Sequence, residues 1–269
     1  MNDLPDLKCF SLTTRYCLSE EYDTQIVSLF HRMPNLQELT LYIIIVDGTV
    51  FINGGDIYNE ILVHMPRLHL FNFLISSHAE IDNLVYHASK DDIQQTLSNI
   101  KYQEVDCIVN YDYILVECHI FSLPFMFEDL IGIGNAFPSI IFSHVTFLQV
   151  NDKAPFEHEF FQQIAWSFPF LKQLNVLNIN RQSSILTILN SNDNLLYSIV
   201  KYLYLMSLYL THAHIDNVEQ FLNETKTRLP RLTTLVVNCK DLTIITDNFT
   251  RDAMRINCIN NAKKILLSI

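Results

Sequence analysis

The sequence predicts an α/β fold, a leucine-rich-repeat solenoid with a curved parallel sheet on its concave side and helices on its convex side. Three observations lead to this prediction. A leucine-rich motif recurs along the chain, proline marks five of its copies, and an amphipathic segment precedes most of them. One such helix–strand unit cannot bury its apolar face alone, so the units are expected to stack on one another.

The recurring motif is an apolar residue, Pro, any residue and then Leu-x-x-Leu-x-Leu, as in MPNLQELTL at residues 33–41. The copies that carry the Pro have as their first leucine Leu7, Leu36, Leu68, Leu171 and Leu232. Copies without it begin at Val145 and Leu205, a weak one at Val105 and a partial one at Ala262. We therefore expect a single domain over residues 1–269 with about eight to nine degenerate repeats, the last one truncated.

Amphipathic segments come before the motifs and predict helices. Residues 20–33, 56–65, 157–168 and 215–229 each place apolar side chains on one helical face and end just before a proline, where a helix should stop. The middle of the chain is irregular. Two strand-like runs predict a hairpin near residues 105–121, and the Asn- and Ser-rich stretch Asn178–Asn194 predicts a loop.

Each Leu-x-Leu that ends a motif predicts a strand whose alternate residues face opposite ways. The leucines should be buried in neighbouring parallel strands of one sheet, as expected for Leu39, Leu41, Leu174, Val176, Leu235 and Val237. The residues between them should form the concave face. We predict that this face binds a partner, through Glu38, Thr40, Gln173, Asn175, Ser207, Tyr209 and Val236.

Composition narrows the classes of function. The net charge of −11 and the lack of a basic run argue against nucleic-acid binding. Only 5 glycines are present, which disfavours phosphate-cradling enzymes. The 6 cysteines are scattered, as expected for reduced thiols in a cytoplasmic or nuclear protein. The apolar runs are shorter than the roughly 20 residues that span a bilayer, so we expect no membrane interaction.

Four short patterns resemble catalytic or metal motifs but fail on inspection. The HEFFQ run from His158 lacks the second histidine of a zinc motif. The GIGNAF run from Gly132 lacks a third glycine and falls within a predicted helix. His212 and His214 have no cluster of further ligands, and Cys118 and His119 should face opposite sides of a strand. We therefore expect no enzyme, no cofactor and no bound metal.

The alternation of MPNLQELTL, SFPFLKQLNV and RLPRLTTLVV with helices resembles the repeat region of F-box proteins. The phrases CHIFSLPFMFEDL, APFEHEFFQQIAWSFPFLKQL and TDNFTRDAMRINC resemble a poorly characterised invertebrate F-box/LRR family, and the likeness covers essentially the whole chain. The motif itself is degenerate. The Asn or Cys of such repeats, three residues after the last leucine, is replaced, for example by Ile179 and Lys240, so a buried asparagine ladder is not expected.

The resemblance implies a protein-interaction scaffold, the substrate-recognition part of an F-box-type ubiquitin ligase receptor. Such proteins bind the adaptor of a cullin ligase through an F-box. This chain opens directly on a repeat at Leu4–Leu7, so adaptor binding is expected only through an F-box outside it. The partner held by the repeats is unknown. Two alternatives stay open: a stand-alone leucine-rich-repeat binding or inhibitor protein without a ubiquitin link, and an enzyme on an irregular α/β fold.

Overall fold

The chain folds into two compact units, each built from a sheet and helices. The computed structural model describes residues 4–48, 51–80, 89–98, 100, 103–111, 115–183, 198–254, 257 and 262–268. The first unit comprises residues 1–126 and 136–138, and the second comprises residues 127–135 and 139–269. The α/β class is thus confirmed. A division into compact units does not decide between one domain and two, so the single domain stays a prediction.

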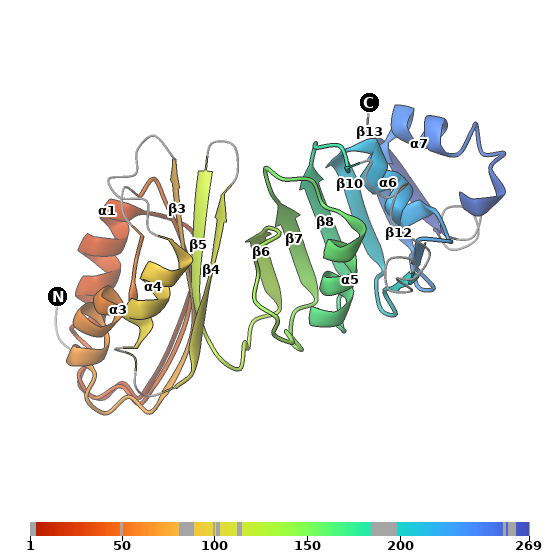
Figure 1. Cartoon of the computed structure of the whole chain (residues 1–269). Helices are drawn as coiled ribbons and strands as arrows, with labels where there is room; N and C mark the ends of the chain where they lie inside the picture. The colour runs from red at the N-terminus through yellow and green to blue at the C-terminus, as the bar shows by residue number, and fades with distance from the viewer. Residues whose placement is uncertain are drawn as a thin grey trace. The chain divides into compact units, whose positions relative to one another are not determined.

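The sheet of the first unit has five strands in the order β1-β2-β3-β5-β4 (Figure 1). The first three run parallel: β1 (Cys9–Leu18), β2 (Glu38–Val46) and β3 (Leu70–Glu80). The next two, β4 (Val105–Tyr111) and β5 (Leu115–Ser122), form an antiparallel pair, and β5 also runs antiparallel to β3. The hairpin predicted near residues 105–121 is therefore confirmed.

Helical segments cover one face of this sheet (Figure 1). The first connection contains α1 (Ser19–Glu21), the π-helical η1 (Tyr22–Val27) and α2 (Ser28–Phe30). The later connections contain α3 (Gly54–Glu60), η2 (Leu62–His64) and α4 (Lys90–Leu97). Side chains from the helices and from the strands share a core in which Phe30, Ile57, Leu39 and Leu41 are fully buried.

The second unit has a six-stranded, entirely parallel sheet in the order β13-β12-β10-β8-β7-β6. Its strands are β6 (Asp129–Ile133), β7 (Phe147–Asn151), β8 (Gln173–Asn178), β10 (Ser207–Ala213), β12 (Thr234–Asn238) and β13 (Lys264–Ser268). Helices α5 (His158–Ser167) and α6 (Ile215–Leu222) lie on one face of it (Figure 1). Smaller elements are α7 (Cys239–Ile245), η5 (Asp252–Met254) and the parallel pair β9 (Val200–Lys201) and β11 (Thr227–Arg228).

The leucines of the motif form one layer of the second core. Leu148, Leu174, Leu208 and Leu235 are register partners on four adjacent strands, and each is 0% exposed. Burying a side chain of this size stabilises the fold by roughly 1.5–3 kcal/mol. The helix layer closes over them with aromatic rings, because Phe161 of α5 and Phe221 of α6 are also fully buried. The recurring leucines of the sequence thus form the interface between sheet and helices.

The predicted strands are confirmed, but their placement in a single sheet is wrong. Leu39, Leu41, Leu174, Val176, Leu235 and Val237 are all 0% exposed and all lie in parallel strands. However, β2 belongs to the sheet of the first unit, whereas β8 and β12 belong to the sheet of the second. The hairpin explains the difference, because β4 pairs only with β5 and the parallel order does not continue beyond it.

Two helix predictions are also wrong. Gly132 lies in strand β6, where the pairing with β7 shifts by one residue. Its φ of 83° is a conformation that glycine adopts without strain, as a β-bulge requires. The helix predicted over 215–229 ends at Leu222, because Asn223 accepts hydrogen bonds from Thr225 and begins a turn. Of the loop predicted over Asn178–Asn194, residues 184–194 lie outside the described part of the chain.

Candidate protein-binding face

The central strands of the second sheet, β8, β10 and β12, alternate between core and opposite face over their motif residues. In β8, Leu174 and Val176 are fully buried against the helices, whereas Gln173 is exposed and Asn175 is partly exposed. The same alternation repeats in β10 and β12. Successive side chains of a strand point to opposite faces, so the residues between the leucines share the face of the sheet opposite to α5 and α6.

Register places these intervening residues in continuous rows across the sheet. One row is Gln149, Asn175, Tyr209, Val236 and Leu266, in which each residue is the register partner of the next. The row beside it is Phe147, Gln173, Ser207, Thr234 and Lys264. We call these ten residues the sheet face. None of them is fully buried, so the sheet face offers a mixed polar and apolar surface that spans five strands.

The structure brings together five of the seven residues predicted to bind a partner. Gln173, Asn175, Ser207, Tyr209 and Val236 all belong to the sheet face. Glu38 and Thr40 do not join them, because they lie on β2 of the first unit, where they pair with Leu70 and Asn72. The error has the same source as the single-sheet prediction. The motif repeats in both units, but its repetition does not reveal where one sheet ends.

Sequence reasoning missed half of the sheet face. Gln149 lies within the copy of the motif that begins at Val145, and Asn175 Nδ2 donates a hydrogen bond to Gln149 Oε1 at 3.1 Å. Phe147, Thr234 and Leu266 sit at equivalent places in their own copies. Aligning every copy on its leucines would have found them, including the copies that lack proline.

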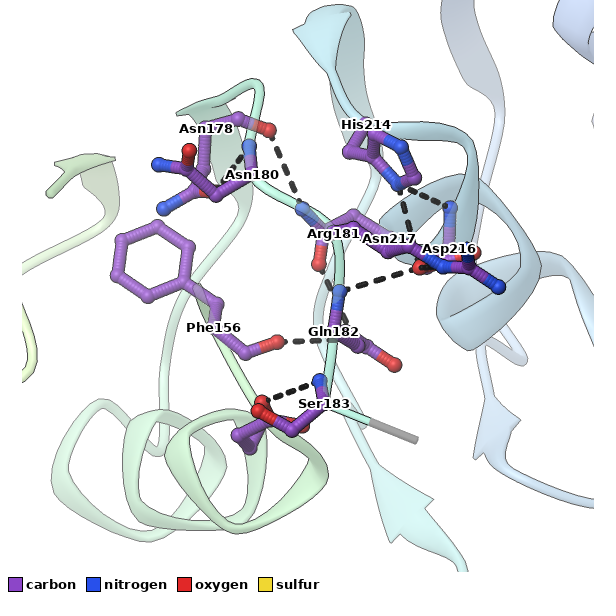
Figure 2. Close-up of polar contacts among 10 residues, drawn as sticks. Phe156, Asn178, Asn180, Arg181, Gln182, Ser183, His214, Asp216 and Asn217 are labelled. Atoms are coloured by element: carbon purple, nitrogen blue, oxygen red, sulfur yellow. Dashed lines mark hydrogen bonds and ion pairs between the residues drawn. The ribbon is translucent and has the colours of Figure 1, made fainter. Parts of the chain in front are cut away.

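The carboxyl ends of the strands are tied together by amide side chains (Figure 2). Asn178, 2% exposed, donates from Nδ2 to the carbonyl oxygens of Asp152 and Ala154, at 3.1 and 2.7 Å. Its Oδ1 accepts a hydrogen bond from Asn180 N at 3.0 Å. An asparagine two residues after the last motif position therefore bridges neighbouring segments. This single amide lies at the second residue after the motif, not the third, and it does not form a ladder through successive repeats, so the absence of a ladder stays a prediction.

The segment after Asn178 extends this network toward both helices. Gln182 Nε2 donates to the carbonyl oxygen of Phe156, just before α5, and to Asn217 Oδ1 in α6, at 2.8 and 3.1 Å (Figure 2). The Gln182 N–H donates to Asp216 Oδ2 at 3.1 Å. Asn217 is fully buried and returns a bond to the Asn178 carbonyl oxygen. These bonds fix the ends of the strands that carry the sheet face.

The residues of the discounted motifs have structural partners. His158 is buried, and its two ring nitrogens contact Gln220 Oε1 at 3.1 Å and the Ser198 carbonyl oxygen at 3.0 Å. His214 caps α6, accepting from the Asp216 N–H at 3.2 Å. In the described part of the chain, no three His, Cys, Asp or Glu side chains converge as metal ligands would.

A buried polar cluster in the first unit was not predicted. Ser76 Oγ lies 2.7 Å from His119 Nδ1, and His78 Nδ1 lies 3.9 Å from Glu117 Oε1. Asn110 Nδ2 donates to Glu117 Oε2 at 3.3 Å. Burial lowers the pKa of His78, although the Glu117 carboxylate acts in the opposite direction. Ser76 and His119 are only 2% and 1% exposed, so the pair has no access for a substrate.

The neighbouring thiol is inert. Cys118 is 1% exposed and packs in the core on the helix side, so Cys118 and His119 face opposite sides as predicted. Burial raises the pKa of the Cys118 thiol far above its usual value, with a smaller contribution from Cys107. A thiol that stays protonated and buried is a poor nucleophile.

Comparison with protein-family models, with curated proteins and with solved structures finds no match. No helix in the described part of the chain combines the length and the apolar character that crossing a bilayer requires. The residues themselves are therefore the basis for any functional proposal.

Proposed function

We propose that the protein is a non-enzymatic interaction scaffold of the leucine-rich-repeat type, whose sheet face binds another protein. The observation that carries this proposal is the row of register partners from Gln149 to Leu266. It is a regular surface, opposite to α5 and α6, to which five adjacent strands each contribute a side chain. Tyr209 lies at its centre, and tyrosine is a favoured anchor at protein interfaces.

Two further observations support a repeat architecture. Every copy of the motif in the second unit leads into a strand of the same parallel sheet. In addition, Asn178 bridges adjacent segments through its side chain, the function that buried asparagines perform in stacked repeats. A generic α/β domain would need neither the repeated leucine layer nor the bridging amide.

We further propose that the partner is a substrate of a ubiquitin ligase, and that the chain is the recognition region of an F-box-type receptor. This finer proposal rests on the resemblance of the repeated phrases alone. The alternative is a stand-alone scaffold or inhibitor with no ubiquitin link. The two differ in one measurable property, which is whether the full gene product copurifies with the adaptor of a cullin ligase.

Site-directed photo-crosslinking in the cells of origin tests the scaffold. A photoreactive phenylalanine analogue replaces Tyr209 or Ser207 on the sheet face, and in a control variant it replaces Gln163, which is exposed on α5. We expect the two sheet-face variants to capture the same protein and the control variant not to capture it. Equal capture from all three positions would contradict the proposed face. The adaptor of a cullin ligase among the copurified proteins would support the ligase proposal, and its absence would favour the stand-alone alternative.

A further inference from the structure

A stack of side chains lies just before the strands of the second sheet. The ring centroids of Phe170 and Tyr204 are 5.6 Å apart, and Arg231 Cζ lies 4.9 Å from the centroid of the Tyr204 ring. Phe170 is 46% exposed and Arg231 is also exposed, whereas Tyr204 between them is partly exposed. The three residues therefore present two aromatic rings and a guanidinium to solvent as one stack.

Backbone pairing holds this stack at the amino ends of the strands. The residue before each strand continues the pairing of the sheet. The N–H of Met206 donates to the Lys172 carbonyl oxygen, and the N–H of Thr233 donates to the Met206 carbonyl oxygen, both at 2.8 Å. Each member of the stack stands two residues before one of these paired positions. Adjacent strands lie about 4.8 Å apart, so the stack spans roughly 10 Å across three connections.

Two further positive charges lie close to the stack. Lys201 of β9 and Arg228 of β11 are register partners in the small parallel pair, and both are exposed. Lys201 stands three residues before Tyr204, and Arg228 stands three residues before Arg231. Like charges directly opposite each other on neighbouring strands disfavour the pairing. An anionic group that binds between them would remove this repulsion.

These cations have no acidic partner in the part of the chain that the structure describes. Lys201, Arg228 and Arg231 lie beyond ion-pair distance of every described carboxylate. A guanidinium that stacks on a ring keeps the N–H groups at its edge available for a carboxylate. The second unit contains 12 Lys and Arg and 12 Asp and Glu, so it is neutral as a whole. The positive charge beside the stack is therefore a local feature.

We propose that Phe170, Lys201, Tyr204, Arg228 and Arg231 form an edge patch that binds an extended segment of a partner protein, rich in carboxylates and aromatic side chains. The carboxylates of the segment pair with the cations, and a guanidinium can bind one of them through two parallel hydrogen bonds. Its aromatic side chains pack against the two rings of the stack. About three residues of an extended chain span roughly 10 Å, which matches the length of the stack. The proposal does not rest on binding of a partner to the sheet face.

A protein segment fits the edge patch better than a nucleic acid does. Aromatic rings beside cations also bind single-stranded nucleic acids, through stacking and backbone contacts. However, the chain carries a net charge of −11, and its field repels a long polyanion. A segment with a few carboxylates between aromatic side chains carries much less charge. Charge therefore favours the peptide.

Fluorescence anisotropy with a labelled peptide of alternating Glu and Trp residues tests the edge patch on the full chain. We expect saturable binding that weakens as salt rises, because exposed charges are screened. Lys201→Gln and Arg231→Gln should each weaken binding about fivefold. The matched control, Lys240→Gln, removes the same charge from α7, just after β12, and should change the affinity less than about twofold. All three side chains are exposed, so the melting temperatures should match that of the parent.

Two further probes and one variant separate the alternatives. A peptide of alternating Glu and Ser has the same charge but no rings, and should bind about tenfold more weakly. Single-stranded oligothymidine should also bind more weakly than the peptide that contains Trp. Tyr209→Ala changes the sheet face alone, so it should leave the affinity for this peptide unchanged.

Four outcomes would overturn the proposal. The first is the absence of binding of the Glu and Trp peptide at low salt. The second is an equal loss of affinity in Lys201→Gln and Lys240→Gln, which would indicate diffuse attraction rather than a site. Tighter binding of oligothymidine would assign the edge patch to nucleic acid. A loss of peptide affinity in Tyr209→Ala would place the peptide on the sheet face.

Discussion

Asn178 donates a hydrogen bond from its side chain to the carbonyl oxygen of Ala154 at 2.7 Å, although 24 residues separate the two in sequence. Ala154 follows β7, and Asn178 ends β8. The bond therefore joins two adjacent repeats at the same edge of the sheet. With the second bond to Asp152, one buried amide satisfies two carbonyl groups that the sheet leaves unpaired.

Replacing this amide should destabilise the second unit. We expect Asn178→Ala to lower the free energy of unfolding by about 1–3 kcal/mol, because buried carbonyl groups lose their donors. Urea denaturation measures the change. The matched control is Asn175→Ala on the sheet face, which should stay within about 0.5 kcal/mol of the parent. If both variants lose the same stability, the bridging role of Asn178 is wrong.

Leu174→Asp should cost several kcal/mol and could unfold the second unit. Leu174 is 0% exposed beneath α5 and α6, and a carboxylate there would be buried without a partner. Thermal melting followed by circular dichroism checks the expectation. A melting temperature like that of the parent would show that Leu174 does not face the core.

Tyr209→Ala should leave the melting temperature nearly unchanged. Tyr209 is partly exposed on the sheet face, so its removal takes little from the core. Affinity for the partner that is crosslinked at Ser207 should fall, since aromatic anchors contribute strongly to binding. If Tyr209→Ala unfolds whereas Leu174→Asp stays as stable as the parent, Tyr209 faces the core and Leu174 faces the surface.

Glu60→Gln should raise stability near neutral pH. The pKa of Glu60 is higher in the folded protein than in the unfolded chain, so its ionised form disfavours folding. Its contribution to stability is present below the unfolded pKa of about 4.3 and is lost as the pH rises through the folded pKa. The advantage of the variant should therefore shrink as the pH falls. Denaturant titrations at several pH values decide this, and an advantage that grows on acidification would contradict it.

The contribution of His78 to stability should depend on pH in the opposite direction to that of Glu60. Burial lowers its folded pKa, so the unfolded chain binds more protons once the pH falls below about 6.5. Stability of the first unit should decline from there down to the folded pKa, and His78→Gln should decline less. The informative quantity is the difference in stability between parent and variant as the pH falls below about 6.5, because the other titratable groups contribute equally to both proteins. If the stabilities of the parent and of His78→Gln fall with the same slope against pH, the proposed effect of His78 is ruled out.

Individual strands and helices could be predicted well from the sequence, because buried residues recur with the period of each kind of element. Leucines two residues apart, such as Leu39 and Leu41, indicate a strand with one buried face, and the structure places them so. Gly132 was misread because apolar residues on both sides of it fit a helix as readily as a bulged strand. The first and second sheets were merged because the hairpin that ends the first depends on pairing between β5 and β3.

The residues of the candidate sites differ in the same way: alternation within a strand predicts some of them, whereas others depend on pairing between distant strands. Tyr209 and Asn175 follow from alternation within a strand, so sequence finds them. The buried pair of Ser76 and His119 requires knowing that β3 and β5 are antiparallel neighbours, because 43 residues separate the two side chains. The surroundings of Tyr22 depend on the fold in a similar way, because its neighbours Asp56 and Glu60 come from a different connection of the sheet.

The all-parallel order of the second sheet has a consequence for how this unit folds. Leu174 and Leu208 are 34 residues apart, and Leu208 and Leu235 are 27 apart, yet each pair meets side by side. Every added strand thus closes a chain segment of similar length, and closure entropy changes only slowly with length. On closure entropy alone, no adjacent pair of strands in this sheet is favoured over another as the place where the sheet begins to form.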